Sequence, residues 1–155
     1  MRAPGLRREP ERRRAGTYEL MAAYWPTADA DPTAPAYLVE FARRWKETPK
    51  VVFSTTPDQV GWNTRLVRGG LVDEVVRLKQ QPGKKIEVGG ASIAATLLRH
   101  GLIDEVQLYV QPVILGGGTP MFPALAEARR LRLVDTRVFR SGVVFLRYQR
   151  ADDAR

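Results

Sequence analysis

The chain has 155 residues, of which 44% are hydrophobic and 27% charged, and its formal net charge is +8. This composition is typical of a globular protein, and the length suits one domain with a true core. The lack of cysteine excludes disulfides, thiolate ligands and a cysteine nucleophile, while the single histidine, His100, excludes a site with several histidine ligands. We therefore expect no metal site. The sequence contains no membrane span and no signal peptide, so we expect a cytoplasmic protein.

The first residues carry much of the positive charge. Residues 1–14 contain six arginines and two glutamates, so half of the net charge of +8 lies in this arm. The arm has two prolines and no hydrophobic periodicity, and we expect it to be disordered. No aromatic residue lies between its arginines to stack on bases, so nucleic-acid binding is not favoured. At the other end, residues 151–155 are expected to form a short tail.

Hydrophobic patterns predict helices and strands that alternate along the chain. The expected helices cover residues 17–25, 36–47, 71–81 and 91–101, and the expected strands cover residues 50–55, 84–88, 104–115, 130–139 and 142–150. Thr17 is the expected N-cap of the first helix, and Pro26 ends it. The last two strands are expected to form a hairpin. This order predicts an α/β protein with a mixed sheet flanked by helices on both faces.

Two glycines, Gly89 and Gly90, separate the expected strand at 84–88 from the helix that follows. A helix N-terminus presents free N–H groups and the positive end of the helix dipole, and glycine lets a phosphate approach without meeting a Cβ atom. The turn formed with Ala91 and Ser92 therefore suits phosphate binding. It matches neither the GxGxxG dinucleotide motif nor the P-loop. On spacing alone, phosphate binding and a plain strand-to-helix turn are equally supported.

Several of these segments together resemble a reductase family. The matching stretches are KVVFST, LVDEVVRLK and, most specifically, VGGAS with GLIDEVQLYVQPVILGGGTPMF. Over roughly residues 16–149 the chain resembles the C-terminal reductase domain of the riboflavin-biosynthesis deaminase-reductase and its dihydrofolate-reductase-like relatives. The resemblance implies a dihydrofolate-reductase-like domain over residues 15–150, often a homodimer. It also implies NADPH as the cofactor and hydride transfer to a heterocyclic or ribose-derived small-molecule substrate.

The resemblance also implies where the cofactor lies. Residues Gly89–Ser92 match the family's turn against the cofactor pyrophosphate. The family's Ser-Arg-Thr segment, which contacts the adenosine 2'-phosphate, is Ser54, Thr55 and Thr56 here. Because the arginine of that segment is absent, the choice between NADPH and NADH stays open. A third cofactor motif, Gly-Arg-x-Thr-Tyr-Glu, is matched from Thr17 onward.

The substrate side of the site has weaker sequence signals. Tyr24 and Trp25, at the end of the first helix, are candidates for lining the substrate cleft, and a packing role is the alternative. The sequence identifies no catalytic acid or base. His100 lies at a helix end, where it would interact with the dipole, and Asp104 and Glu105 open a strand and are expected to be solvated.

Members of the family begin with a hydrophobic strand inside the sheet, and residues 1–14 do not resemble such a strand. The chain is therefore expected to lack it, which would leave unpaired N–H and C=O groups on its neighbours. Three hypotheses follow. In the first, the chain is a reductase of the 5-amino-6-(5-phosphoribosylamino)uracil reductase or dihydrofolate reductase type. In the second, it is a truncated or catalytically impaired relative that binds nucleotide. In the third, it is a basic protein whose arm binds nucleic acid.

Overall fold

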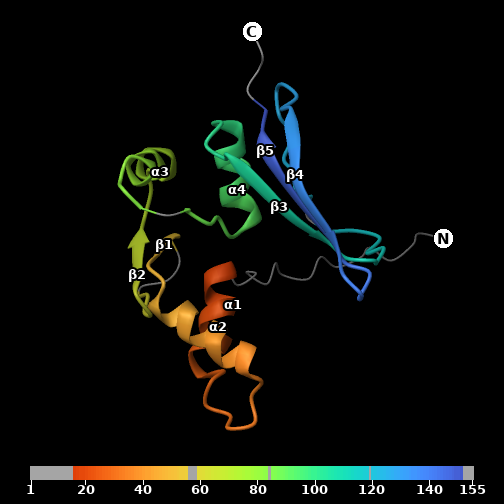
Figure 1. The fold of residues 1–155 in the computed structure, drawn as a ribbon. Coiled ribbons are helices and arrows are strands. Elements are labelled where there is room, and N and C mark those ends of the chain that lie inside the picture. The colour runs from red at the N-terminus through yellow and green to blue at the C-terminus, as the bar shows by residue number, and fades with distance from the viewer. Residues whose placement is uncertain (1–15, 56–58, 84, 119, 152–155) are drawn as a thin grey trace, which may run out of the picture. The chain divides into compact units, whose positions relative to one another are not determined.

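A computed structural model describes residues 16–55, 59–83, 85–118 and 120–151 (Figure 1). The chain divides between Gly69 and Gly70 into two compact units. Both contain helices and strands, and this confirms the predicted α/β class. The predicted arm at 1–14, and all of the predicted tail after Ala151, lie outside the described residues. No described helix has the length and apolar character that crossing a membrane requires.

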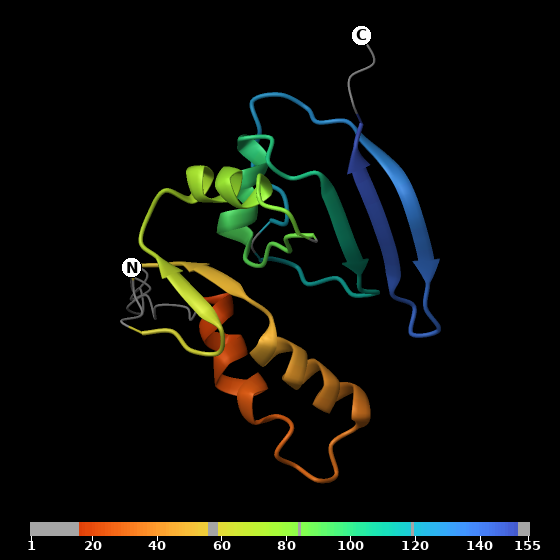
Figure 2. The same ribbon diagram turned by 60° about the vertical axis from the view of Figure 1, so that its left-hand side comes forward.

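The N-terminal unit contains two α-helices that lie side by side and a pair of parallel strands (Figure 1 and Figure 2). Its elements are α1 (Thr17–Tyr24), the 3-10 helix η1 (Trp25–Thr27), α2 (Ala36–Glu47), β1 (Lys50–Phe53) and β2 (Thr64–Val67). The register pairs Lys50 with Thr64 and Phe53 with Val67. The two predicted helices and the first predicted strand are confirmed. The sequence did not predict β2, because its four residues, TRLV, are too few to show a period.

The start of α1 differs from its prediction. Gly16, rather than Thr17, is the N-cap, and Thr17 is the first residue of the helix. The Gly16 N–H donates a hydrogen bond of 2.9 Å to the Glu19 carboxylate. The Glu19 side chain thus satisfies a backbone donor and places a negative charge near the positive end of the dipole. The helix can therefore begin without a hydroxyl at its N-cap.

Aromatic rings form the core of the N-terminal unit. The apolar face of α2 buries Ala42 and Trp45. The Trp45 ring stacks on Tyr18 of α1 at a centroid distance of 6.2 Å. A second pair joins Trp25 of η1 to Phe41 of α2, with centroids 4.2 Å apart. These contacts connect α2 with the segment before it, as the helical period of its apolar residues requires.

The C-terminal unit contains an antiparallel sheet with α4 beside β3 (Figure 1 and Figure 2). Its elements are α3 (Leu71–Lys79), α4 (Ala91–Arg99), β3 (Glu105–Val110), β4 (Leu131–Val138) and β5 (Val144–Arg150). Strand β5 lies between β3 and β4 and is antiparallel to both. The predicted helices and hairpin are confirmed. Strand β3 ends at Val110, before the predicted end at residue 115, and Pro112 has no N–H with which to continue a ladder.

The predicted strand at 84–88 is wrong. Residues 85–88 pair with no strand in the described part of the chain, and Ile86 and Val88 are 48% and 37% exposed. An apolar, alternating stretch becomes a strand only where a neighbour completes its hydrogen bonds. The described strands pair in two sheets, the parallel pair β1–β2 and the antiparallel β3–β5–β4, so both kinds of pairing expected of a mixed α/β fold are present.

Candidate functional site

The glycine turn leads directly into α4, as the sequence predicts. Gly90 is the N-cap of the helix, with φ of 101° and ψ of 124°. A residue with a Cβ atom is strained at this φ, so the turn requires glycine. The first intrahelical bond runs from the Ala94 N–H to the Gly90 carbonyl, at 3.0 Å.

The beginning of α4 is open to an anion. No side chain caps the helix within the described residues, and Ala91 and Ser92 are exposed. The N–H groups of Ala91, Ser92 and Ile93 precede the first intrahelical donor and have no acceptor within the helix. Together with the dipole, they can bind a phosphate without a positively charged side chain.

A cleft lined by both apolar and charged side chains lies next to this turn in the C-terminal unit. Its volume is about 690 Å³, and its walls include Val75 of α3, Leu98 of α4 and Val106 of β3. Val88 and Ala94, on either side of the turn, line the cleft, whereas the four predicted residues Gly89–Ser92 do not. The cleft therefore flanks the predicted phosphate site without including it.

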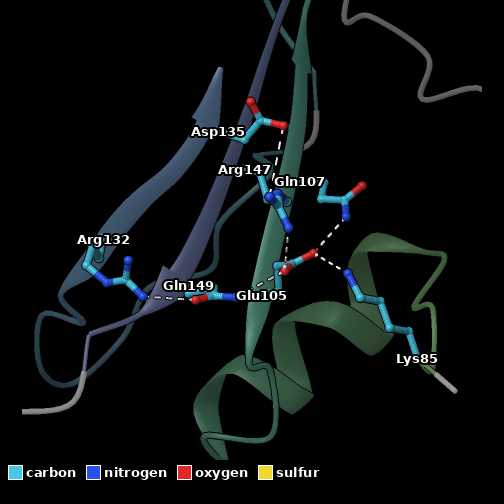
Figure 3. A network of polar contacts seen from close by, with 7 residues as sticks. All are labelled: Lys85, Glu105, Gln107, Arg132, Asp135, Arg147 and Gln149. Carbon is cyan, nitrogen blue, oxygen red and sulfur yellow. Dashed lines mark hydrogen bonds and ion pairs between the residues drawn. The ribbon is translucent and has the colours of Figure 1, made fainter. Parts of the chain in front are cut away.

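A polar network centred on Glu105 joins the start of β3 to its surroundings (Figure 3). Its carboxylate accepts hydrogen bonds from Gln107 Nε2 at 2.7 Å and Lys85 Nζ at 3.1 Å. Gln149 and Arg147 of β5 approach the other oxygen at 3.5 and 3.7 Å. The network thus ties the segment that begins at Lys85 to two strands of the sheet.

The same contacts set the charge state of Glu105. The hydrogen bond from Gln107, followed by the one from Lys85, holds the pKa of this carboxyl below its ordinary value. The side chain is 19% exposed and has four partners, so the expectation that Glu105 is solvated is wrong. An ionised, fully engaged carboxylate is unsuited to donating a proton, and the network has a structural role. The matching alternation of polar residues on β3 and β5 is the sequence signal for it.

The remaining predicted residues lie in the N-terminal unit. Thr17 is exposed at the first position of α1, and Ser54 follows β1 directly. The Ser54 N–H donates to the Val67 carbonyl at 3.2 Å, and its own carbonyl accepts a bond of 3.5 Å from Arg68 Nη1. Thr56 lies outside the described residues. Arg68 was not identified from the sequence, because the strand that precedes it was not predicted.

The two aromatic candidates for the substrate cleft have different surroundings. Trp25 packs on Phe41 and lies 5.0 Å from Tyr24 in an edge arrangement. Its Nε1–H donates to the Met21 sulfur at 3.1 Å. Tyr24 is 53% exposed. Within this unit Trp25 therefore contributes to packing, while Tyr24 presents an accessible ring.

Comparison with known proteins identifies the class to which this fold and turn belong. The chain matches the model of the RibD C-terminal domain over residues 6–145. It therefore belongs to the RibD C-terminal domain family, and the predicted resemblance is confirmed. The match includes both the turn at Gly89–Ser92 and the segment after β1.

Three individual proteins are also similar to this chain. The chain is 35% identical over 133 residues to the uncharacterized protein YyaP of Bacillus subtilis (strain 168), covering 85% of this chain and 69% of YyaP. It is 35% identical over 102 residues to the uncharacterized protein YwjB of the same organism, covering 64% of this chain and 58% of YwjB. A crystal structure from Shewanella sp. PV-4, of a protein assigned to riboflavin biosynthesis, superposes with a TM-score of 0.60 and 27% identity. That similarity covers 68% of this chain and 62% of the Shewanella chain, so this chain spans less than two thirds of the solved relative.

Proposed function

We propose that the chain is an NADPH-dependent reductase of the riboflavin-biosynthesis type, which transfers a hydride to 5-amino-6-(5-phosphoribosylamino)uracil or to another heterocyclic or ribose-derived substrate. The observation that carries this proposal is the family match over residues 6–145, which includes the turn at Gly89–Ser92. Membership of this family supports a reductase-type function. The dihydrofolate reductase type of substrate belongs to the same proposal, although the acceptor differs: dihydrofolate takes the hydride on its heterocyclic ring, and the riboflavin precursor takes it on its ribose-derived part.

The cofactor phosphates would be held at the beginning of α4. The open N–H groups of Ala91 and Ser92 and the conformation of Gly90 fit a phosphate group, and NADPH would supply the hydride. The protein's own contribution would be to bind and orient the reactants and to exclude water. Such positioning is the main source of rate in hydride transfer, and it requires no strong acid or base.

A turnover assay tests the proposal. The purified chain is mixed with NADPH and a panel of pyrimidinone and pteridine substrates, and the loss of NADPH absorbance is followed. Oxidation that depends on one of these substrates, and that is lost in Gly90→Asp, is the expected result. NADPH binding without turnover on any substrate would instead favour a nucleotide-binding relative that has lost activity.

The proposal includes the homodimer that the family resemblance implies. Sedimentation equilibrium would then give twice the chain mass of 17.4 kDa. A mass equal to that of one chain would contradict this part of the proposal and leave the reductase activity to be judged by the turnover assay.

A further inference from the structure

Apolar side chains gather at the end of the C-terminal sheet where β3 and β4 finish. Val110 and Val138, the last residues of these strands, both pair with Val144 of β5, so the three side chains form one row across the sheet. Figure 2 shows that β3 finishes at the same end of the sheet as the turn between β4 and β5. The chain stays at this end after β3, because a Cβ atom on Gly142 of that turn would lie 3.3 Å from Pro112 Cγ. The residues that follow Pro112 therefore extend the apolar row.

The side chains at this end of the sheet are accessible. Of the residues that follow Pro112, Ile114 is 97% exposed and Leu115 is 82% exposed. We call this surface the end patch, and its exposed apolar residues are Val110, Val113, Ile114, Leu115, Val138 and Phe139. The sequence contains no charged residue over positions 106–126, which include the first four residues of the patch. Depletion of charged residues distinguishes the core of a protein–protein interface from the rest of a surface.

The size of the end patch is that of a dimer interface. Its side chains expose about 550 Å² of apolar surface, taking roughly 100–200 Å² for each side chain when fully exposed. Because roughly 65% of a homodimer interface is apolar, this area corresponds to about 850 Å² of total surface per copy. A standard stable interface buries about 800 Å² per partner. The end patch is therefore large enough to hold two chains together.

We propose that the end patch binds the end patch of a second copy of this chain in a two-fold symmetric contact. This inference rests on the homodimer of the proposed function, to which it assigns a surface. A two-fold axis brings identical patches together, so apolar side chains meet apolar side chains and no charge is buried. The exposed residues Arg137 and Arg140 lie next to Val138 and Phe139 in the sequence and belong to the solvated rim.

The charge of the chain adds a consequence for salt. Each copy has a formal net charge of +8, so the two copies repel each other in solution of low ionic strength. Salt screens this repulsion and also favours the burial of apolar surface. Raising the concentration of sodium sulfate should therefore strengthen the dimer. A contact held by ion pairs between the copies would weaken instead, and that result would overturn the apolar end patch as the interface.

Sedimentation equilibrium of Ile114 variants tests the surface. The Ile114 side chain is almost fully exposed, so its replacement should leave the fold and the melting temperature unchanged. We expect Ile114→Asp to weaken the dimer by at least about hundredfold, because each copy then places a carboxylate in an apolar contact. Ile114→Ala should weaken it by about tenfold and leave it assembled at about 100 μM chain. The matched control, Tyr37→Asp, introduces the same charge at an exposed position on α2 and should remain dimeric.

Hydrogen exchange in the wild type identifies what covers the end patch. Among the described residues, no backbone acceptor is found for the N–H groups of Ile114 and Leu115, so these amides should exchange fast in a monomer and more slowly in a dimer. Protection that rises with protein concentration is the expected result. Protection that is equal at all concentrations would mean that another part of the same chain covers the patch. Fast exchange at all concentrations would mean that nothing covers it, and either result would overturn the inference.

The outcomes separate this inference from the proposed function. A dimer that Ile114→Asp retains would overturn the end patch as the interface and leave the homodimer standing, whereas a monomeric wild type would overturn both. The reductase activity is judged by the turnover assay on the same wild-type protein. A dimer that oxidises NADPH with no substrate of the panel would count against the reductase and leave the end patch to the sedimentation result.

Discussion

Among the described residues of the N-terminal unit, the buried side chains are Ala42 and Trp45, both on α2. Among those of the C-terminal unit they come from four different elements and are Val75, Leu97, Val106 and Phe145. The first core consists of a few large rings whose contacts join neighbouring segments of the chain. The second consists of three aliphatic side chains and one ring, that of Phe145, contributed by two helices and a three-stranded sheet. Removal of a single ring should therefore destabilise the N-terminal unit more than loss of one aliphatic residue destabilises the C-terminal unit.

The largest effect is expected for Trp45→Ala. This change removes the ring that stacks on Tyr18 and that Lys50 Nζ approaches at 4.5 Å, so the N-terminal unit should lose about 3–5 kcal/mol of unfolding free energy. Urea unfolding followed by the fluorescence of the remaining tryptophans measures this loss, because all three tryptophans of the chain precede Gly69. Tyr37→Ala, at a position 74% exposed on the same helix, is the control. Equal losses in the two variants would contradict the account of this core.

Leu97→Ala should be the most damaging single truncation of an aliphatic side chain in the C-terminal unit. Leu97 is 1% exposed, so its removal leaves a cavity and should cost about 2–5 kcal/mol. Hydrogen exchange of the β3 and β5 amides measures the loss within this unit. Ile114→Ala, at a position 97% exposed, should leave the same amides unchanged. Slow exchange that persists in Leu97→Ala would place the core of this unit elsewhere.

A smaller effect is expected where α4 ends. Gly101 has a φ of 66°, and the N–H groups of Gly101 and Leu102 bond to the carbonyls of Leu98 and Leu97 at 3.1 and 2.9 Å. This is the Schellman pattern, which favours glycine at the left-handed position. No atom would clash with a Cβ there, so Gly101→Ala should cost about 1 kcal/mol through backbone strain alone. The control is Gly83→Ala, which also has open space, and equal unfolding midpoints for the two variants would be evidence against the strain.

The smallest effect concerns acid stability. Because the pKa of Glu105 is lowered from 4.5, chiefly by the hydrogen bond from Gln107, the folded state binds this proton less readily than the unfolded state does. The resulting stabilisation is present above the unfolded pKa and is lost as the pH falls through the lowered folded value. Melting temperatures measured downward from pH 5.5 should therefore fall more steeply for the wild type than for Glu105→Gln. Melting temperatures that fall equally with pH in the wild type and in Glu105→Gln would show that the Glu105 network does not contribute to stability in this pH range.

The sequence predicts those elements whose pattern is complete within one segment. In the helix at 36–47, the apolar residues recur with the helical period and so mark the buried positions. In the hairpin at the end of the chain, two segments of alternating polarity flank a turn. The turn at Gly89 and Gly90 was also located correctly, because glycine before a helix has a local physical cause. In each case the neighbours in sequence determine the structure.

The errors occur where structure depends on partners distant in sequence. The stretch at 85–88 has a strand-like pattern but no paired neighbour among the described residues, and β2 has a neighbour but too short a pattern. Arg68 was overlooked for the same reason, since its contact with the Ser54 carbonyl follows from the pairing of β1 with β2. The Glu105 network likewise depends on the register between β3 and β5. Pairing and register are tertiary properties that a local pattern does not contain.

The central claim is that the beginning of α4 binds a cofactor phosphate, and NADPH titration of the wild type, Gly90→Asp and Ser92→Asp tests it most directly. Aspartate in the first turn should stabilise the helix through its dipole but repel a phosphate, so Ser92→Asp should melt at or above the wild-type temperature and bind NADPH at least about tenfold more weakly. Gly90→Asp should also lose binding, and Ser92→Ala should retain it. Tight NADPH binding that both aspartate variants keep would contradict the account.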